Sequence, residues 1–323
     1  MGRLSYYRRI FAAYLGSGPS QLTFWHDVPE PNPNARPGEL GEYYQLFAQK
    51  ADYQGYFDAD GIPMLDYRGA VGLQYNPIAI AQYGLGNYNL FQRNGDRERE
   101  RKFLRSADWL VANLEQTPCG LWYWMHRFDW EYRDTLKNPW YSALANGQGN
   151  SLLVRAHRHT GDGRYLEAAQ RAFGPFLVDI HEGGVAATDE RGNLWFEEYV
   201  VFPPTHTLNG FIWATWGIYD YALATHDLRA QELFQRSMET LRSELPRFDL
   251  GFWSLYEQSG TALPMIASTF YHQLHIAQLR VLLRLTGVPC FQEMAERWER
   301  YRRNPWNRRR AVAYKAAFKL CYY

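Results

Sequence analysis

Residues 195–212, WFEEYVVFPPTHTLNGFI, join a strand-like run to a helix and place two adjacent carboxylates beside a tyrosine. The first eight residues have the aromatic and β-branched character of a strand. The Pro-Pro pair that follows ends this strand, because neither proline has an N–H to donate to a neighbouring strand. Apolar residues from Leu208 onward keep helical spacing. The stretch therefore predicts that Glu198 and Tyr199 lie where a strand passes into a buried helix.

The same alternation of an aromatic segment with a pair of helices recurs along the chain. Trp-bearing segments that we expect to be short strands occur at 120–124, 192–196 and 251–256. We expect helices at about 141–160, 164–178, 207–225, 229–245, 268–287, 290–302 and 308–320. Short breaks at 161–163 and 225–227 would make neighbouring helices antiparallel. This weak repeat predicts a mainly α fold, an (α/α) toroid or barrel of antiparallel helix pairs with short β-hairpins lining a cleft.

The N-terminal part of the chain reads differently. We divide the chain into 1–75, an extended arm with a β-hairpin region, and 76–323, the toroid, because 1–40 is irregular and 43–67 is rich in strand and turn residues. Pro77 can open a helix that the glycines at 84 and 86 would end, and an amphipathic helix follows at 97–115. Asp58-Ala59-Asp60-Gly61 favours a hairpin turn, with calcium binding as the alternative.

Composition excludes several classes of protein. Of 323 residues, 46% are hydrophobic, enough for a sizeable core, and the net charge of +1 gives no overall attraction to nucleic acid or anionic membranes. No apolar run reaches the length of a membrane span and the N-terminus does not resemble a signal peptide, so we expect a cytoplasmic protein with reduced cysteines. The aromatic share of 17% favours a cleft for sugar rings, or else an aromatic core or protein interface.

Four polar clusters are candidates for chemistry: Glu198-Tyr199, Tyr256-Glu257, the run 271–275, and His206 after the two prolines. In a strand, neighbouring side chains face opposite ways, so the first pair can share a cleft only at a bulge or at the strand's end. The histidines of the run 271–275 could bind a metal, but no third ligand is near in sequence, and a core or substrate contact is favoured. No phosphate loop or nucleophile elbow is present. We therefore expect acid–base chemistry with no metal and no cofactor.

Several motifs together resemble those of one known family. The run 76–88, NPIAIAQYGLGNY, is similar to PIxIAQYGLxxY, and 139–149, PWYSALANGQG, is similar to WYSAMAQGQ. The run 271–279, YHQLHIAQL, is similar to YHxxHIxQL, and Glu197-Glu198-Tyr199 and 208–211 also match. These signatures, in this order from about residue 75 to 302, belong to the D-glucuronyl C5-epimerases, which convert glucuronate to iduronate in heparan sulfate and heparin precursors.

The resemblance implies functional residues, an acidic polysaccharide as partner and a homodimer. Its catalytic positions fall on Glu198, Tyr199, Tyr256 and Tyr271. Residues of the matching motifs are implied to bind substrate: Gln82, Tyr83, Tyr88, Trp140, Tyr141, Gln148, Asn209, His272 and His275. Two features depart from the animal enzymes. The β-sandwich after the first motif is missing, and Gln258-Ser259 stands where they have Arg-His, which leaves the partner of the substrate carboxylate unassigned.

Epimerisation removes a hydrogen from the carbon next to a carboxylate and returns it to the opposite face. This step needs acid–base groups on both faces of the sugar ring and donors for the growing negative charge. We hypothesise that Glu198 and Tyr271 form the acid–base pair, with Tyr199 and Tyr256 steadying the carboxylate or the glycosidic oxygen. A tyrosine could also act as a phenolate base if neighbours lowered its pKa. A uronate lyase, a glycoside hydrolase or a non-catalytic glycan-binding protein are the alternatives.

Overall fold

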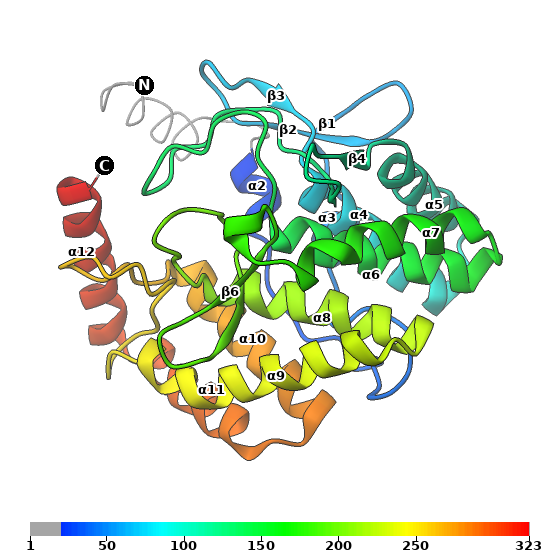
Figure 1. The fold of residues 1–323 in the computed structure, drawn as a ribbon. Helices are drawn as coiled ribbons and strands as arrows, with labels where there is room; N and C mark the ends of the chain where they lie inside the picture. The colour runs from blue at the N-terminus through cyan, green and yellow to red at the C-terminus, as the bar shows by residue number, and fades with distance from the viewer. Residues whose placement is uncertain (1–20, 323) are drawn as a thin grey trace.

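The computed structural model describes residues 21–322, in which four consecutive helix pairs form an arc (Figure 1). The inner helices are α4 (Pro77–Asn94), α6 (Ala143–Thr160), α8 (Leu208–Thr225) and α10 (Thr269–Thr286). Each packs against the helix that follows it, namely α5 (Arg97–Ala112), α7 (Gly163–Phe173), α9 (Leu228–Glu244) and α11 (Pro289–Arg303). The arrangement confirms the prediction of a mainly α, toroid-like fold built from helix pairs.

Burial explains which helices are inside. All residues of α6 from Ala143 to Ala156 are buried, and α8 is buried almost throughout. The outer helices bury only one face: in α5 the buried residues are Phe103, Ser106, Ala107 and Leu110, which recur with helical spacing. A last helix, α12 (Pro305–Tyr322), packs on α10 and α11 and is the red helix beside the label C in Figure 1.

The first inner helix is longer than its sequence indicates. The side chain of Asn76 caps α4 by accepting from the N–H groups of Ile78 and Ala79, but the helix continues through Gly84 and Gly86. A Cβ on Gly84 would lie 2.7 Å from Leu152 Cδ2, and one on Gly86 would lie 2.6 Å from a backbone oxygen. The prediction that these glycines end the helix is therefore wrong. They permit close packing, and α4 ends instead at Asn94, where it is capped by Gly95, whose φ of 68° suits glycine.

Short antiparallel strands connect the helices. One sheet contains β1 (Tyr56–Phe57), β2 (Pro63–Asp66) and β3 (Leu73–Gln74); the others pair β4 (Glu115–Gln116) with β5 (Trp122–Tyr123) and β6 (Ala186–Thr188) with β7 (Leu194–Phe196). In the turn between β1 and β2, Asp58 Oδ1 accepts from the N–H groups of Asp60 and Ile62, which confirms the hairpin turn. Short helices occur at α2 (Gln21–Trp25), α3 (Ala48–Ala51), η1 (Gly174–Leu177), η2 (Ile180–Glu182) and η3 (Leu245–Phe248).

Two predicted strands are shorter than expected. The strand expected over 195–202 stops at Phe196, well before the prolines, because its partner β6 starts at Ala186 and the chain before β6 turns into η2. The segment 251–256 forms only isolated bridges, Asp249 with Ser254 and Leu255 with Ile266. Both segments therefore pass into irregular backbone that is free to present side chains to a cavity.

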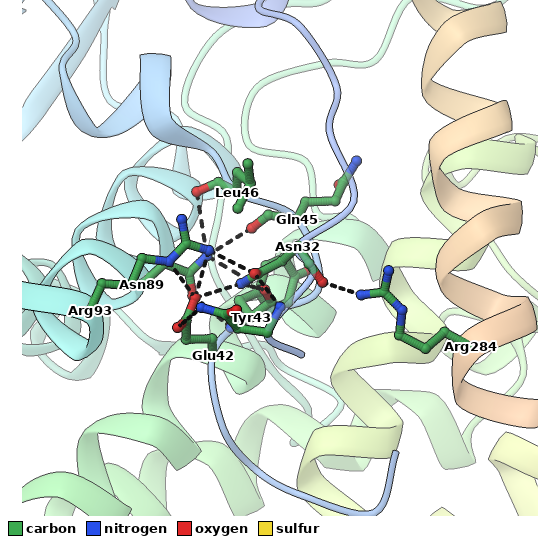
Figure 2. Close-up of polar contacts among 9 residues, drawn as sticks. Asn32, Glu42, Tyr43, Gln45, Leu46, Asn89, Arg93 and Arg284 are labelled. Atoms are coloured by element: carbon green, nitrogen blue, oxygen red, sulfur yellow. Dashed lines mark hydrogen bonds and ion pairs between the residues drawn. The ribbon is translucent and has the colours of Figure 1, made fainter. Parts of the chain in front are cut away.

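Residues 32–47, which we call the strap, close the opening of the arc between α4 and α10, since the ring of described helices is not itself closed (Figure 2). On the α4 side, Asn89 Oδ1 accepts from the N–H of Tyr43 at 2.6 Å, and Asn89 Nδ2 donates to the Gln45 carbonyl at 2.8 Å. On the α10 side, the Arg284 guanidinium donates to the Asn32 carbonyl. This part of the predicted N-terminal arm therefore links α4 to α10 through hydrogen bonds. Residues 1–20 of that arm lie outside the described residues.

A buried ion pair ties the strap to the inner helices. Arg155 of α6 and Asp220 of α8 are both fully buried, with Nη1 and Oδ2 2.6 Å apart. Arg155 Nε also donates to the carbonyl of Gly41, and the hydroxyl of Tyr44 donates to Asp220 Oδ1 at 2.5 Å. These bonds satisfy the charges that burial would otherwise penalise.

The structure also shows the state of the cysteines and the character of the described helices. All three cysteines are free thiols. Between residues 21 and 322, no helix has the length and apolar character needed to cross a bilayer. The division of the chain at residue 75 stays a prediction.

Candidate active site

The N-terminal ends of all four inner helices face one cavity of about 290 Å³. Its lining includes the N-cap residues of α4, α6 and α10, which are Asn76, Ser142 and Ser268, and Asn209 in the first turn of α8. The side chains of Asn76, Ser142 and Ser268 accept from N–H groups in the first turns of their helices. Each helix N-terminus still carries a partial positive charge, which favours anions. Four such ends around one cavity favour a negatively charged ligand.

Glu198 and Tyr199 both line this cavity, because strand β7 has ended two residues before them. Of the two arrangements that the sequence permits, the turn at the strand's end is the one observed. Glu198 is buried, and its Oε2 lies 3.4 Å from Nδ2 of Asn209. It packs directly on Gly210, where a Cβ would lie 2.2 Å from the same oxygen. Burial raises the pKa of Glu198 from 4.5 to about 8, so the carboxyl carries a proton for most of the time at neutral pH.

The neighbouring carboxylate, Glu197, binds the following loop and does not line the cavity. Glu197 is fully buried and accepts three bonds from the following loop: from the N–H groups of Thr205 and His206, and from His206 Nδ1 at 2.6 Å. The imidazole of His206 also stacks on Trp195. Glu197 therefore anchors the loop that joins β7 to α8, and this anchoring holds Glu198 in place.

Tyr256 and Tyr271 complete the group around Glu198. Their rings meet edge to face with centroids 4.9 Å apart, and the carbonyl of Tyr256 accepts from the N–H of Leu208 at the start of α8. Burial, followed by the nearby Glu198 carboxyl, raises the pKa values of Tyr199 and Tyr256 well above 10. These two phenols stay protonated at neutral pH and can donate hydrogen bonds. The idea that neighbours lower a tyrosine pKa to give a phenolate is not supported for them.

A second buried carboxyl group, that of Glu257, lies behind the cavity wall. The hydroxyl of Tyr132, which lines the cavity, donates to Glu257, and burial raises the pKa of Glu257. The ring of Tyr132 lies 4.2 Å from that of Tyr199. Trp140 and Trp130 extend this aromatic wall, which suits the apolar face of a sugar ring.

Two lysines also line the cavity. Lys50 of α3 is buried, donates to the Phe24 carbonyl at 2.6 Å and lies 3.9 Å from Asp27 Oδ2; burial lowers its pKa to about 8. Lys315 of α12 donates to the Ile266 carbonyl at 2.7 Å, and its Nζ lies 5.9 Å from the ring centroid of Tyr256.

The structure brings together six of the residues singled out from the sequence. Those that line the cavity are Glu198, Tyr199, Tyr256, Tyr271, Trp140 and Asn209. Tyr83 lines a separate, smaller hollow beside Arg105. The other residues expected to bind substrate do not line either space; these are Gln82, Tyr88, Tyr141, Gln148, His272 and His275. Whether any of these residues acts on a substrate stays a prediction.

The two histidines of α10 lie in the core. His272 stacks on Trp253, with ring centroids 3.8 Å apart, and its Nδ1 lies 2.7 Å from Ser254 Oγ. His275 Nδ1 lies 3.1 Å from the same oxygen. Burial lowers the pKa of His272 to about 4 and the pKa of His275 well below its ordinary value, so both are neutral. Among residues 21–322, no three acidic, histidine or cysteine side chains gather as a metal site would need.

Sequence reasoning overlooked Tyr132, Trp130 and Lys50. The segment 128–132, FDWEY, holds aromatic residues at every second position, which is the spacing of one strand face and could have indicated a wall. Lys50 had no such signal, because its role depends on how α2 and α3 meet.

Comparison with known proteins agrees with the motifs. The family described as D-glucuronyl C5-epimerase C-terminus matches residues 116–300, more than half of the chain. The D-glucuronyl C5-epimerase of Caenorhabditis elegans is 31% identical over 220 residues, 63% of this chain and 35% of that protein. An uncharacterised protein of Methanocaldococcus jannaschii is 29% identical over 198 residues, 60% of this chain and 63% of that protein. The chain thus spans about a third of the first relative and less than two thirds of the second.

Solved structures include more distant matches. The unsaturated glucuronyl hydrolase from Bacillus sp. GL1 is 14% identical with a TM-score of 0.46, covering 69% of this chain and 60% of that one. The cellobiose 2-epimerase from Spirochaeta thermophila is 14% identical with a TM-score of 0.45, covering 92% of this chain and 84% of that one.

Proposed function

The chain belongs to the D-glucuronyl C5-epimerase family, and on that premise we propose that it epimerises C5 of D-glucuronate to L-iduronate within a heparosan-like polysaccharide. One observation carries the proposal. Glu198, Tyr256 and Tyr271, which come from three separate segments of the chain, surround a single cavity. The proposal includes an acidic polysaccharide as substrate and, from the family resemblance, a homodimer.

The cavity offers what the reaction needs. The hydrogen on C5 is a very weak acid, and its removal places negative charge on the attached carboxylate. Phenols of Tyr199 and Tyr256, which stay protonated, can donate to that charge. The four helix N-termini lower its energy further.

Glu198 and Tyr271 would exchange the proton. A carboxyl group with a pKa of about 8 exists in both forms near neutral pH, so it can accept the C5 proton in one direction and return it in the other. Tyr271 lies in the first turn of α10, on a different element from Glu198, and its ring contacts that of Tyr256. In this scheme the two groups face opposite sides of the sugar ring.

The test is to incubate the purified protein with heparosan and to follow iduronate formation by NMR together with chain length. An epimerase forms iduronate in chains of constant length. Shorter chains with unsaturated-sugar absorbance would establish a lyase instead, and shorter chains without it would establish a hydrolase. Tight binding with unchanged sugars would establish a glycan-binding protein.

A further inference from the structure

Helix α12 lies outside the segment that matches the family, residues 116–300, yet it supplies two residues to the cavity wall, Lys315 and Phe318. We propose that Lys315 binds the carboxylate of the uronate ring whose C5 faces Glu198 and Tyr271. This inference rests on the proposed function, because it assigns the carboxylate partner within the same cavity.

The position of the ammonium group suits this role. Its bond to the Ile266 carbonyl, at 2.7 Å, orients Nζ towards Tyr256, whose ring centroid is 5.9 Å away. Tyr256 in turn contacts Tyr271. In a uronate the carboxylate is bonded directly to C5, and an ammonium binds a carboxylate at about 2.7–2.9 Å. A ring with C5 beside these tyrosines therefore places its carboxylate within reach of Lys315.

The buried wall of the cavity disfavours an unpaired anion, and this favours such a partner. Glu198 and Glu131 line the cavity, and Glu257 lies behind Tyr132 of its wall. Burial disfavours the charged forms of Glu198 and Glu257 and raises their pKa values. The carboxylate of a substrate is unfavourable there unless a cation accompanies it. The field of Lys315 reaches this region, since it counteracts part of the rise in the pKa of Glu257.

Lys50 is the other lysine of the wall, and its contacts indicate a structural role. Its ammonium is only 3% exposed, donates to the Phe24 carbonyl and lies over the Phe24 ring at 4.5 Å. The carboxylate of Asp27, 3.9 Å away, is its counter-ion. Lys50 therefore holds α2 against α3. The place of Lys315 beside Tyr256 makes it the better candidate for a substrate carboxylate.

The experiment compares two ligands and four proteins. Binding of heparosan and of carboxyl-reduced heparosan, in which the uronates are neutral glucose units, is measured for wild type, Lys315→Met, Lys315→Arg and Arg308→Met. Arg308 is an exposed cation on the same helix and serves as the control for net charge. Thermal unfolding of each variant verifies that the protein is folded.

We expect Lys315→Met to lose about 10- to 100-fold in affinity for heparosan, the usual value of a charge-assisted hydrogen bond, and to bind the reduced polymer as wild type does. Lys315→Arg should recover part of the loss, and Arg308→Met should show none. Equal weakening for both polymers, or the same loss in Arg308→Met, would overturn the assignment. So would a wild type that does not prefer the acidic polymer.

The two levels of the proposal fail separately. If wild type prefers the acidic polymer through Lys315 but forms no iduronate, the carboxylate site stands and the epimerase function fails. If wild type forms iduronate and Lys315→Met does so with unchanged kcat and KM, the function stands and the role of Lys315 fails.

Discussion

Replacing Glu198 with glutamine should make the protein more stable at alkaline pH, although it removes a proposed catalytic group. The folded state holds the Glu198 carboxyl at a pKa of about 8, whereas the unfolded chain has the ordinary value of 4.5. As the pH rises from 4.5 to 8, the unfolded state loses this proton and the folded state keeps it. The stability contributed by the protonated group is therefore complete below pH 4.5 and is lost as the pH rises through 8.

The size of the effect follows from the two pKa values. The difference between the folded and unfolded pKa values of Glu198 corresponds to about 5 kcal/mol of unfolding free energy, at about 1.4 kcal/mol for each pKa unit. Between pH 5 and pH 9 most of that loss occurs, about 4 kcal/mol as an upper limit. Glutamine does not titrate, so Glu198→Gln escapes this loss and its advantage over wild type should grow by about 2–4 kcal/mol across the interval.

The assay is urea unfolding of wild type and variant at pH 5 and pH 9 at one ionic strength. All other titrating groups are shared by both proteins, so the difference between their unfolding free energies isolates position 198. Glu239→Gln, at an exposed site on α9, is the control. If the difference between Glu198→Gln and wild type is the same at both pH values, the carboxyl is not held protonated by burial, and the proposed role of Glu198 loses its physical basis.

Three further outcomes are expected. Arg155→Met should lower the unfolding free energy by about 3–5 kcal/mol in denaturant titrations, because it leaves the buried Asp220 carboxylate without its partner; a loss below about 1 kcal/mol would show that the pair is not buried in solution. Tyr271→Phe should abolish iduronate formation while leaving the melting temperature within a few degrees of wild type, about the range of a surface change; retained activity would remove Tyr271 from the mechanism. Asn89→Ala should lower the unfolding free energy by about 1–3 kcal/mol and speed proteolysis within the strap, because the backbone groups of Tyr43 and Gln45 lose their hydrogen-bond partners. An unchanged digestion pattern would contradict the role of the strap in linking α4 to α10.

Helix positions could be read from the sequence because periodicity and caps act locally. The helix expected at 207–225 is α8 (Leu208–Thr225), and the break at 225–227 contains the cap residues His226 and Asp227. Gly84 misled the prediction, since its lack of a side chain serves packing against Leu152, a neighbour 68 positions away in sequence that local reasoning does not see.

The site was predictable only where motifs or chemistry marked it. Glu198 and Tyr271 were identified by resemblance. The different roles of Glu197, which holds the loop, and Glu198, which lines the cavity, depend on the length of strand β6, because β6 sets where β7 ends. Lys315 has no motif around it that marks a site, because only the packing of α12 over the cavity places it in the wall. Residues that act through tertiary contacts leave no periodic signal in the chain.

The central claim is that Glu198 exchanges a proton with C5 of a glucuronate residue. It is tested most directly by incubating heparosan in D2O with wild type and Glu198→Gln, and by measuring deuterium at C5 in the recovered polymer. We predict deuterium at C5 of both glucuronate and iduronate with wild type and none above background with the variant. Deuterium incorporated at the wild-type rate by Glu198→Gln, or at no carbon by the wild type, would contradict the account.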